Sequence, residues 1–367
     1  MADEKSFARR ALIVVVLTIT AILLLTLFYY VFDILLIIFM AVLVAVFLRG
    51  SATFLAKYTK IGEGLQMGLI VLVLLIVGII GFIFLAPDVI HQLDELGEGI
   101  PTSMAKLKAS VEAYPHGAAV LSKVPDPAAI WDRVVASGVL KKVAGMFSST
   151  LGAFGNLFVI LMLAGYFAGT PGYYSQGIQR LFPIPKRERV REILETIYNS
   201  LFFWLVGKTA SMIFIGVLTF ALLWLLGVPL ALVLGLIAGL LSFIPNFGPI
   251  IAAVPAVLIA FVKDPWLAVW TIAVYVFVQF VESWVVTPFI EKRTVELEPG
   301  LTMMFQLVMA LLVGTVGLVV ATPILAVIVV LVQMVYVEDI LGDRSEIIPE
   351  QKDMPLDIQP DETASEA

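Results

Sequence analysis

The chain has 367 residues, of which 60% are hydrophobic and 14% are charged; its mean hydropathy is +1.03 and its net charge is −6. Soluble domains are about 45–50% apolar and about 25% charged, so this composition indicates a polytopic membrane protein. With no cysteine and two histidines, His91 and His116, the sequence excludes disulfides, thiolate catalysis and Cys-ligated metals, and it argues against a histidine metal site.

Residues 1–87 carry three predicted membrane spans. The first is the apolar run 11–31, which follows two arginines and, at about 20 residues, can cross the hydrocarbon core. We interpret it as a retained span because no A-x-A-like cleavage site follows it. A tight turn at Asp33 then leads to a short second span at 34–48, and the third span is predicted at 68–85.

Residues 88–149 contain no apolar run of membrane length, which predicts a small helical extracytoplasmic insert. One helix in it is amphipathic, because apolar residues recur at helical spacing: Leu93, Ile100, Met104, Leu107 and Val111. This face either packs within the insert or, as the alternative, forms a coiled contact between subunits.

A fourth span at 151–168 is followed by a basic stretch. Five basic residues lie between 180 and 191, and Ile193, Leu194 and Ile197 lie beside them. The stretch is interpreted either as an interfacial helix against anionic lipid headgroups or as a solvated cytoplasmic connector. The fifth span is predicted at 201–226 and the sixth at 265–286, giving about six full spans.

The apolar segment 230–260 is interrupted in its middle. Pro245 and Pro249 disfavour a continuous helix, while Asn246 and Gly248 supply turn chemistry. Two half-helices therefore meet at a bend around 245–249, and Pro255 follows in the second. In a bilayer such irregular backbone is tolerated only where protein buries it or where it lines a wet cavity.

The closing apolar run, 301–337, is too long for one ordinary span. It carries Gly314, Gly317 and Pro323 near its centre, which predicts a second hairpin or two short helices with these residues as the hinge. The transport core thus spans 150–337. Residues 338–367 hold ten acidic and two basic residues, which predicts a disordered cytoplasmic tail.

Two broken apolar segments in one chain favour a secondary transporter. The half-helix after the first break is expected to present free N–H groups from about Phe247 to Ile251, which suit a polar or anionic substrate. Carbonyls freed before the two prolines would suit a cation or a hydroxyl group. The alternative is a structural kink. The candidate substrate-binding or gating residues are Pro245, Asn246, Phe247, Gly248, Pro249, Pro255 and Gln279.

Glu282 and Lys208 are the candidate ion-coupling residues, because ionisable groups inside a membrane are functional hypotheses by default. Gln279 and Glu282 share a helix face. Glu282 is expected either to couple an ion or to pair with Lys292 or Arg293 near the inner boundary. Snorkelling to the inner surface is the favoured interpretation of Lys208, with pairing to Glu282 as the alternative.

Charge in the short loops predicts the orientation. We predict a multi-pass protein of the cell (inner) membrane with both termini in the cytoplasm. The basic residues of 5–10, 49–60, 180–191 and 292–293 then all lie on the cytoplasmic side. This requires the segment 230–260 to enter and leave the membrane on the outer side. A straight span there would place Lys292 and Arg293 outside.

Three segments carry a family resemblance: LLGVPLALVLGLIAGLLSFIPNFGPIIAAVPA at 225–256, QFVESWVVTPFIEKRTVELEPGL at 279–301 and LLVGTVGLVVATPILAVI at 311–328. The chain resembles the autoinducer-2 exporter family over nearly its whole length. The resemblance implies a homo-oligomeric exporter of small polar signalling molecules or, for some members, a cation/proton antiporter. Members often have tyrosine at the position of Asn246 and histidine at that of Glu298, so ligand preference is not carried over.

We therefore predict a secondary transporter that exports a small polar molecule and is coupled to a proton or sodium ion. A sodium/proton antiporter is the first alternative, and a non-transporting membrane scaffold or assembly factor is the second. No nucleophile, base and orienting group converge, so we expect no enzyme activity. The expected partners are membrane lipid, a small polar substrate and further copies of the chain, without nucleic acid or cofactor.

Overall fold

The computed structural model describes residues 2–56 and 65–73, separate positions between 76 and 87, and residues 150–288 and 297–343. Within these ranges every regular element is helical, which confirms the predicted all-α fold. Four stretches there are long and apolar enough to cross a membrane: Ile34–Leu55, Ile184–Leu225, Pro265–Val286 and Thr315–Glu338. Shorter apolar helices accompany them, so the chain is a membrane protein of several helices, whereas the count of six full spans stays a prediction.

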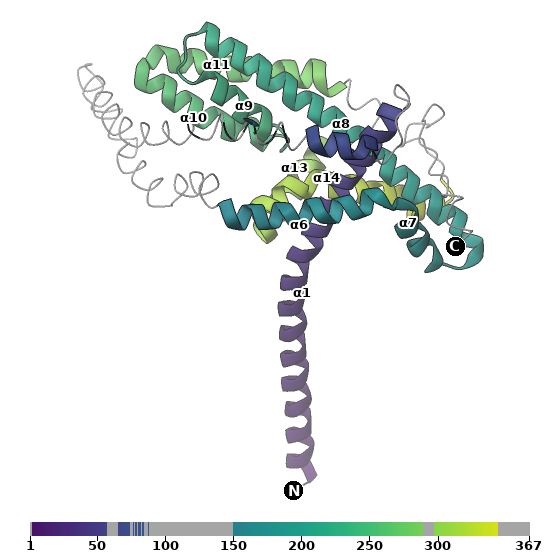
Figure 1. Cartoon of the computed structure of the whole chain (residues 1–367). Helices are drawn as coiled ribbons and strands as arrows, with labels where there is room; N and C mark the ends of the chain where they lie inside the picture. Colours follow the sequence, from purple (N-terminus) through teal and green to yellow (C-terminus); the bar gives the residue numbers. More distant parts are fainter. Residues whose placement is uncertain are drawn as a thin grey trace.

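Helix α1 (Ala2–Ala56) is a single helix of 55 residues. The tight turn predicted at Asp33 is therefore wrong. The physical reason is that residues 11–49 contain neither proline nor glycine, so nothing in this run terminates a helix. The N-terminal part of α1 projects away from the other helices, whereas its C-terminal part packs among them (Figure 1). Leu36 and Leu43 in the latter part are buried.

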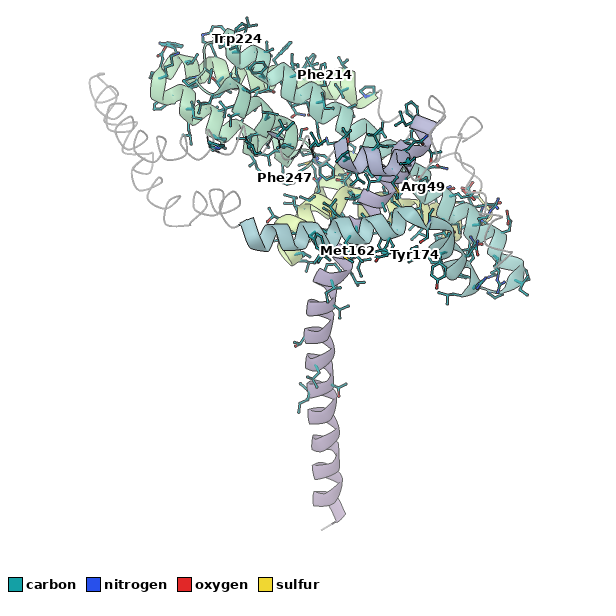
Figure 2. All side chains as sticks on the ribbon, in the orientation of Figure 1. Arg49, Met162, Tyr174, Phe214, Trp224 and Phe247 are labelled. Carbon is teal, nitrogen blue, oxygen red and sulfur yellow. The ribbon has the colours of Figure 1, made fainter. Side chains whose placement is uncertain are left out.

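Four helices form one antiparallel group: α8 (Arg187–Leu225), α9 (Ala231–Leu241), α10 (Phe247–Lys263) and α11 (Pro265–Val281). They lie side by side in Figure 1, and an apolar cluster that includes Leu223, Leu234 and Ala256 fills the space between them. Their outward faces carry exposed apolar side chains such as Phe214 and Trp224 (Figure 2). Such faces suit contact with lipid, because only the inner stripe of each helix is buried.

Helix α8 also corrects the interpretation of the basic stretch. The predicted span began at residue 201, but α8 begins at Arg187 and continues without interruption to Leu225. The basic residues thus lie in the first turns of α8, in the short helix α7 (Pro171–Arg180) and in the 3-10 turn η1 (Ile184–Lys186). There is no separate interfacial helix after residue 186.

The remaining described helices are α6 (Thr150–Gly169), α13 (Pro299–Val313), α14 (Thr315–Leu331) and the π-helical turn η3 (Val332–Glu338). The predicted break in the closing run is confirmed at Gly314, whose φ of 75° ends α13 and starts α14. Gly317 then faces the Met309 carbonyl so closely that a Cβ there would clash. Pro323 is buried inside α14.

Candidate functional site

The bend in the first broken segment lies between α9 and α10. Helix α9 ends at Leu241 and α10 begins at Phe247, so the predicted bend is confirmed, a few residues earlier than expected. Asn246 adopts a φ of 66°, a left-handed conformation that asparagine tolerates better than most residues. Pro249 lies in the first turn of α10, and Pro255 lies in the middle of the same helix.

Gly248 explains why the bend can be so tight. A Cβ at this position would clash with the carbonyl oxygen of Leu241, the last residue of α9. The start of α10 therefore packs directly on the end of α9. Ser242, at the bend, is buried and donates its hydroxyl hydrogen to the Gly239 carbonyl over 2.7 Å.

The expectation of free N–H groups at the start of α10 is wrong for its first residues. The Phe247 N–H donates to the Pro245 carbonyl over 2.8 Å, and the Gly248 N–H donates to the Ile244 carbonyl over 2.9 Å. Pro249 has no N–H. The bend thus satisfies its own donors, and the helix N-terminus does not present the predicted set of groups to a substrate.

Helix α9 is held against α8 by glycines. A Cβ on Gly235 would lie 2.8 Å from the Gly216 carbonyl oxygen, and a Cβ on Gly239 would lie 2.7 Å from the Met212 carbonyl oxygen. Small residues four apart allow such close backbone contact between membrane helices. The sequence analysis did not use this pattern, although Gly235 and Gly239 show it directly.

Glu282 is the centre of a buried polar cluster between α8 and α11. Its Oε1 accepts from Lys208 Nζ over 3.5 Å and from Ser211 Oγ over 3.3 Å, and its Oε2 accepts from Gln279 Nε2 over 3.3 Å. Glu282 and Lys208 are 9% and 8% exposed. The two opposite charges therefore stabilise each other in the interior.

This geometry corrects the favoured interpretation of Lys208. Its side chain does not snorkel to the surface but forms a buried ion pair with Glu282, the alternative that the sequence left open. The physical reason is that the packing of α8 against α11 and the turn that follows it brings the Glu282 carboxylate within 3.5 Å of Lys208 Nζ, a contact between residues 74 positions apart. Lys292 and Arg293, the other proposed partners of Glu282, lie outside the described residues.

The backbone changes its helical type at Glu282. Helix α11 ends at Val281, and the π-helical turn η2 (Glu282–Val286) follows. Such turns occur often at functional sites, because they alter the direction of a side chain within a continuous helix. The predicted span at 265–286 is confirmed as one helical stretch made of α11 and η2.

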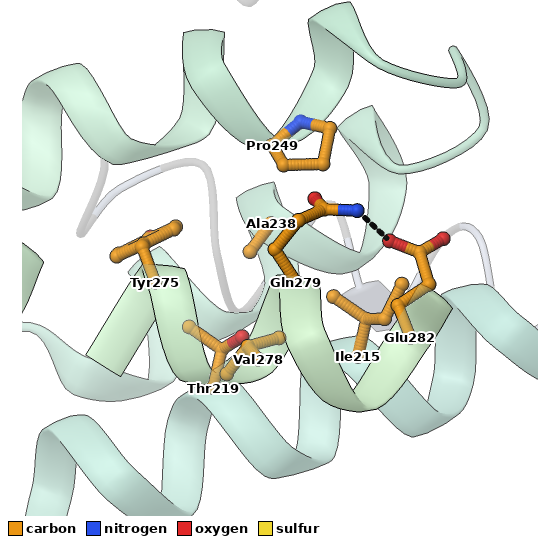
Figure 3. Close-up of a pocket in the computed structure, with 8 residues that line it drawn as sticks. All are labelled: Ile215, Thr219, Ala238, Pro249, Tyr275, Val278, Gln279 and Glu282. Atoms are coloured by element: carbon orange, nitrogen blue, oxygen red, sulfur yellow. Dashed lines mark hydrogen bonds between the residues drawn. The ribbon is translucent and has the colours of Figure 1, made fainter. Parts of the chain in front are cut away.

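A small cavity adjoins this cluster (Figure 3). Its volume of about 10 Å³ is near the lower limit for one ordered water. Its lining residues come from α8, α9, α10 and α11 with η2: Ile215, Thr219, Ala238, Pro249, Tyr275, Val278, Gln279 and Glu282. Three predicted site residues, Pro249, Gln279 and Glu282, are thus brought together, and the sequence analysis missed Thr219 and Tyr275.

Several predicted residues lie elsewhere. Gly314, Gly317 and Pro323 belong to the hairpin of α13 and α14 and do not line the cavity. In that hairpin, Gln306 Nε2 donates to Thr322 Oγ1 over 3.2 Å and so links α13 to α14. In the described part of the chain, no group of three or more metal-ligating side chains is present.

A family model described as AI-2E family transporter matches residues 17–336. YrrI of Bacillus subtilis (strain 168), named as a transport protein, is 36% identical over 152 residues, which are 41% of this chain and 43% of YrrI. YueF of the same organism, also named as a transport protein, is 19% identical over 274 residues, 71% of this chain and 74% of YueF.

TqsA of Escherichia coli (strain K12) is named as an AI-2 transport protein. It is 28% identical to this chain over 155 residues, which are 42% of the chain and 43% of TqsA. The matched region therefore spans less than half the length of YrrI and of TqsA.

Proposed function

Because the chain belongs to the AI-2E transporter family, we propose that it is a secondary transporter that exports a small polar molecule across the inner membrane. The molecule is an autoinducer-2-like signal or a related metabolite, in line with the name of the relative TqsA. Export is coupled to a proton or sodium ion through Glu282, with Lys208 as its counter-charge. As a transporter, the protein is not an enzyme.

The observation that carries this proposal is the position of the Lys208–Glu282 pair. A buried ion pair is rarely the most stabilising choice at its position, because desolvation offsets much of the attraction. Here Glu282 of the pair lines a cavity that Pro249 also lines, and Pro249 directly follows the break between α9 and α10. An ionisable pair beside a discontinuous helix is the arrangement that ion-coupled transporters use.

The break between α9 and α10 supports a gating role for Pro245, Asn246, Phe247 and Gly248. The cavity has too little volume for a metabolite, so transport requires its walls to separate. The bend connects two pairs of helices. In the first pair, α8 and α9 are in close contact at glycines, and in the second pair, Asp264 is the single residue between α10 and α11. Rotation of one pair against the other at residues 242–246 opens the cavity between them.

A sodium/proton antiporter is the second candidate within transport. It normally needs more than one deeply buried acid, whereas Glu282 is the one buried carboxylate among the residues that the structure describes. A membrane scaffold that binds partners through residues 88–149 and the acidic tail is the candidate from another class. The scaffold does not account for a charged pair beside a cavity at a helix break.

For topology we propose a cytoplasmic C-terminus, a hairpin of α9 and α10 that enters and leaves on the outer side, and a homo-oligomer in the membrane. The predicted cytoplasmic N-terminus is not part of this proposal, because α1 is continuous through Asp33 and its two ends lie far apart. The distribution of basic residues in the short loops supports the orientation. Labelling of single cysteines at Asp264, where α10 meets α11, and at Ser175 with an impermeant reagent on intact cells tests it. Labelling of the position 175 variant but not of the position 264 variant contradicts the proposed orientation.

Transport is tested in two steps. The medium of cells with and without the gene is first compared by mass spectrometry, which identifies compounds whose export depends on the protein. Purified protein in vesicles is then assayed for movement of such a compound under imposed pH and sodium gradients. Glu282→Gln is expected to abolish the dependence on the gradient, while the matched control Glu298→Gln, at an exposed position, leaves it intact. Unchanged coupling in Glu282→Gln removes this residue from the mechanism.

A further inference from the structure

We propose that Thr219 and Tyr275 bind the transported solute and that they recognise an uncharged hydroxyl or amide group on it. This inference rests on the proposed transport function and extends it to two residues and a substrate class. Glu282 and Lys208 then form the ion-coupling end of the same cavity.

The first observation is that both hydroxyl groups are buried without a partner. Thr219 is 0% exposed and Tyr275 is 7% exposed, and neither Thr219 Oγ1 nor Tyr275 Oη has a hydrogen-bond partner among the described residues. Buried polar groups are nearly always hydrogen-bonded, because an unsatisfied one keeps its full cost of desolvation. Two such groups lining one cavity call for a ligand that satisfies them.

The second observation is that other threonines of the same bundle satisfy themselves. Thr209 on α8 donates to the Leu205 carbonyl, and Thr271 on α11 donates to the Leu267 carbonyl, each over 2.8 Å. This bond to the carbonyl four residues earlier is the usual solution for threonine in a helix. Thr219 makes no such bond in the structure, so its hydroxyl remains available to the cavity.

The third observation is the arrangement of the polar groups along the cavity. Tyr275, Gln279 and Glu282 recur at helical spacing and share one face of α11 and η2. Seven residues separate Tyr275 from Glu282, about 10 Å at helical rise. The hydroxyl groups and the ion pair are therefore separated along the cavity, with Gln279 between them (Figure 3).

The chemistry of the lining favours an uncharged group. Glu282 is the one charged residue in the lining, and Lys208 already compensates it. A hydroxyl group both donates and accepts, so two of them match a solute hydroxyl or amide, which does the same. The remaining walls, including Ile215, Ala238 and Val278, are apolar and contact the carbon skeleton.

Two substitutions remove only the hydroxyl groups: Thr219→Val and Tyr275→Phe. The matched controls are Thr271→Val, which removes a buried hydroxyl that is already bonded, and Tyr336→Phe at an exposed position. Each variant of the full chain is expressed in cells, the exported compounds are measured in the medium by mass spectrometry, and the purified protein is unfolded by heat. Vesicle assays with the identified compound then give the apparent KM.

We expect compounds that depend on the wild-type protein to carry a hydroxyl or amide group. Thr219→Val and Tyr275→Phe each raise the apparent KM about threefold to tenfold, as loss of one hydrogen bond predicts. Their Tm does not fall, because an unpartnered hydroxyl contributes nothing to the stability of the empty protein. The controls leave KM unchanged.

Three results overturn the proposal: an unchanged KM in both cavity variants, a fall in their Tm, which assigns the hydroxyls a structural role, or an exported compound without a hydroxyl or amide group. Glu282→Gln separates this failure from failure of the proposed function. If Glu282→Gln, assayed at a temperature where its tryptophan fluorescence shows it still folded, abolishes gradient-driven export while the cavity variants transport normally, coupling stands and the solute site is wrong. If no compound depends on the wild-type protein, both proposals fail.

Discussion

The Lys208–Glu282 pair makes the strongest prediction about stability, because each charge depends on the other. Lys208→Met leaves a buried carboxylate without its counter-charge, and Glu282→Gln leaves a buried ammonium group. The double substitution removes both charges at once. We therefore expect each single variant to be strongly destabilised and the double variant to recover most of the loss.

The magnitude follows from the geometry. Lys208 Nζ and Glu282 Oε1 are 3.5 Å apart, and about a tenth of each side chain is exposed. At an effective dielectric constant of about 20, Coulomb's law gives an attraction of about 5 kcal/mol. Removal of one member of such a pair costs about 3–5 kcal/mol, whereas replacement of both by uncharged groups is often close to neutral.

Thermal unfolding of the purified protein in detergent, followed by tryptophan fluorescence, measures these effects. Each single variant is expected to unfold roughly 10 °C below the wild type, at about 2–4 °C per kcal/mol. The control pair is Arg191–Glu195, which lies on α8 with both side chains partly exposed and should contribute at most about 1 kcal/mol. A double variant of Lys208 and Glu282 that shows the sum of the two single losses refutes the coupling.

Two further predictions concern the bend and the end of the bundle. Gly248→Ala should prevent α10 from packing on the Leu241 carbonyl and should lower the free energy of unfolding by at least about 2 kcal/mol in the same thermal assay. Its control is Gly300→Ala, which has open space around it and should change the stability little. Arg189→Gln should cost about 1 kcal/mol, because Arg189 bonds Glu338 over 2.7 Å and thereby joins the start of α8 to the end of η3. This loss should shrink in high salt, and an unchanged Tm at low salt contradicts the prediction.

Local chemistry explains which parts of the fold were predictable from the sequence. A first break was predicted around 245–249 and lies at 242–246, and the break at Gly314 and the span at 265–286 were also predicted, because proline, glycine and asparagine act on the backbone next to them. The same reasoning failed at Asp33, where one acidic residue was interpreted as a turn. A single aspartate does not end a helix when no residue nearby removes a donor or favours a left-handed conformation.

The extension of α8 was missed for a related reason. The span was predicted on the apolar residues from 201 onward, although the basic stretch before it contains strong helix formers and α8 begins two residues after Pro185. Hydropathy marks the part of a helix that lies in lipid, not the position where the helix starts. Its first turns are stabilised instead by ion pairs, including the pair between Arg189 and Glu338.

The candidate site was only partly predictable, because its geometry depends on how α8 packs against α11. Gln279 and Glu282 were assigned to one face from their spacing, but the partner of Lys208 required the tertiary structure. Thr219 and Tyr275 gave no individual signal, because hydroxyl residues are common in apolar helices. Their spacing was informative, however. Lys208, Ser211 and Thr219 are separated by three and eight residues and so lie on one face of α8. Tyr275 precedes Gln279 by four residues, which places both on one face of α11.

The polar faces of α8 and α11 determine how much of the membrane thickness the proposed site covers. Lys208 and Thr219 are eleven residues apart on α8, about 16 Å at helical rise, or roughly half of a hydrocarbon core about 30 Å thick. The solute path that we propose would therefore have the ion pair at one end and the two hydroxyl groups at the other. Its polar groups can therefore contact a solute over half of the membrane without any of them lying in lipid, provided that α9 and α10 cover the path from the other side. The glycines of α9 keep that cover against α8, so we expect it to open where the chain is already broken, between Leu241 and Phe247.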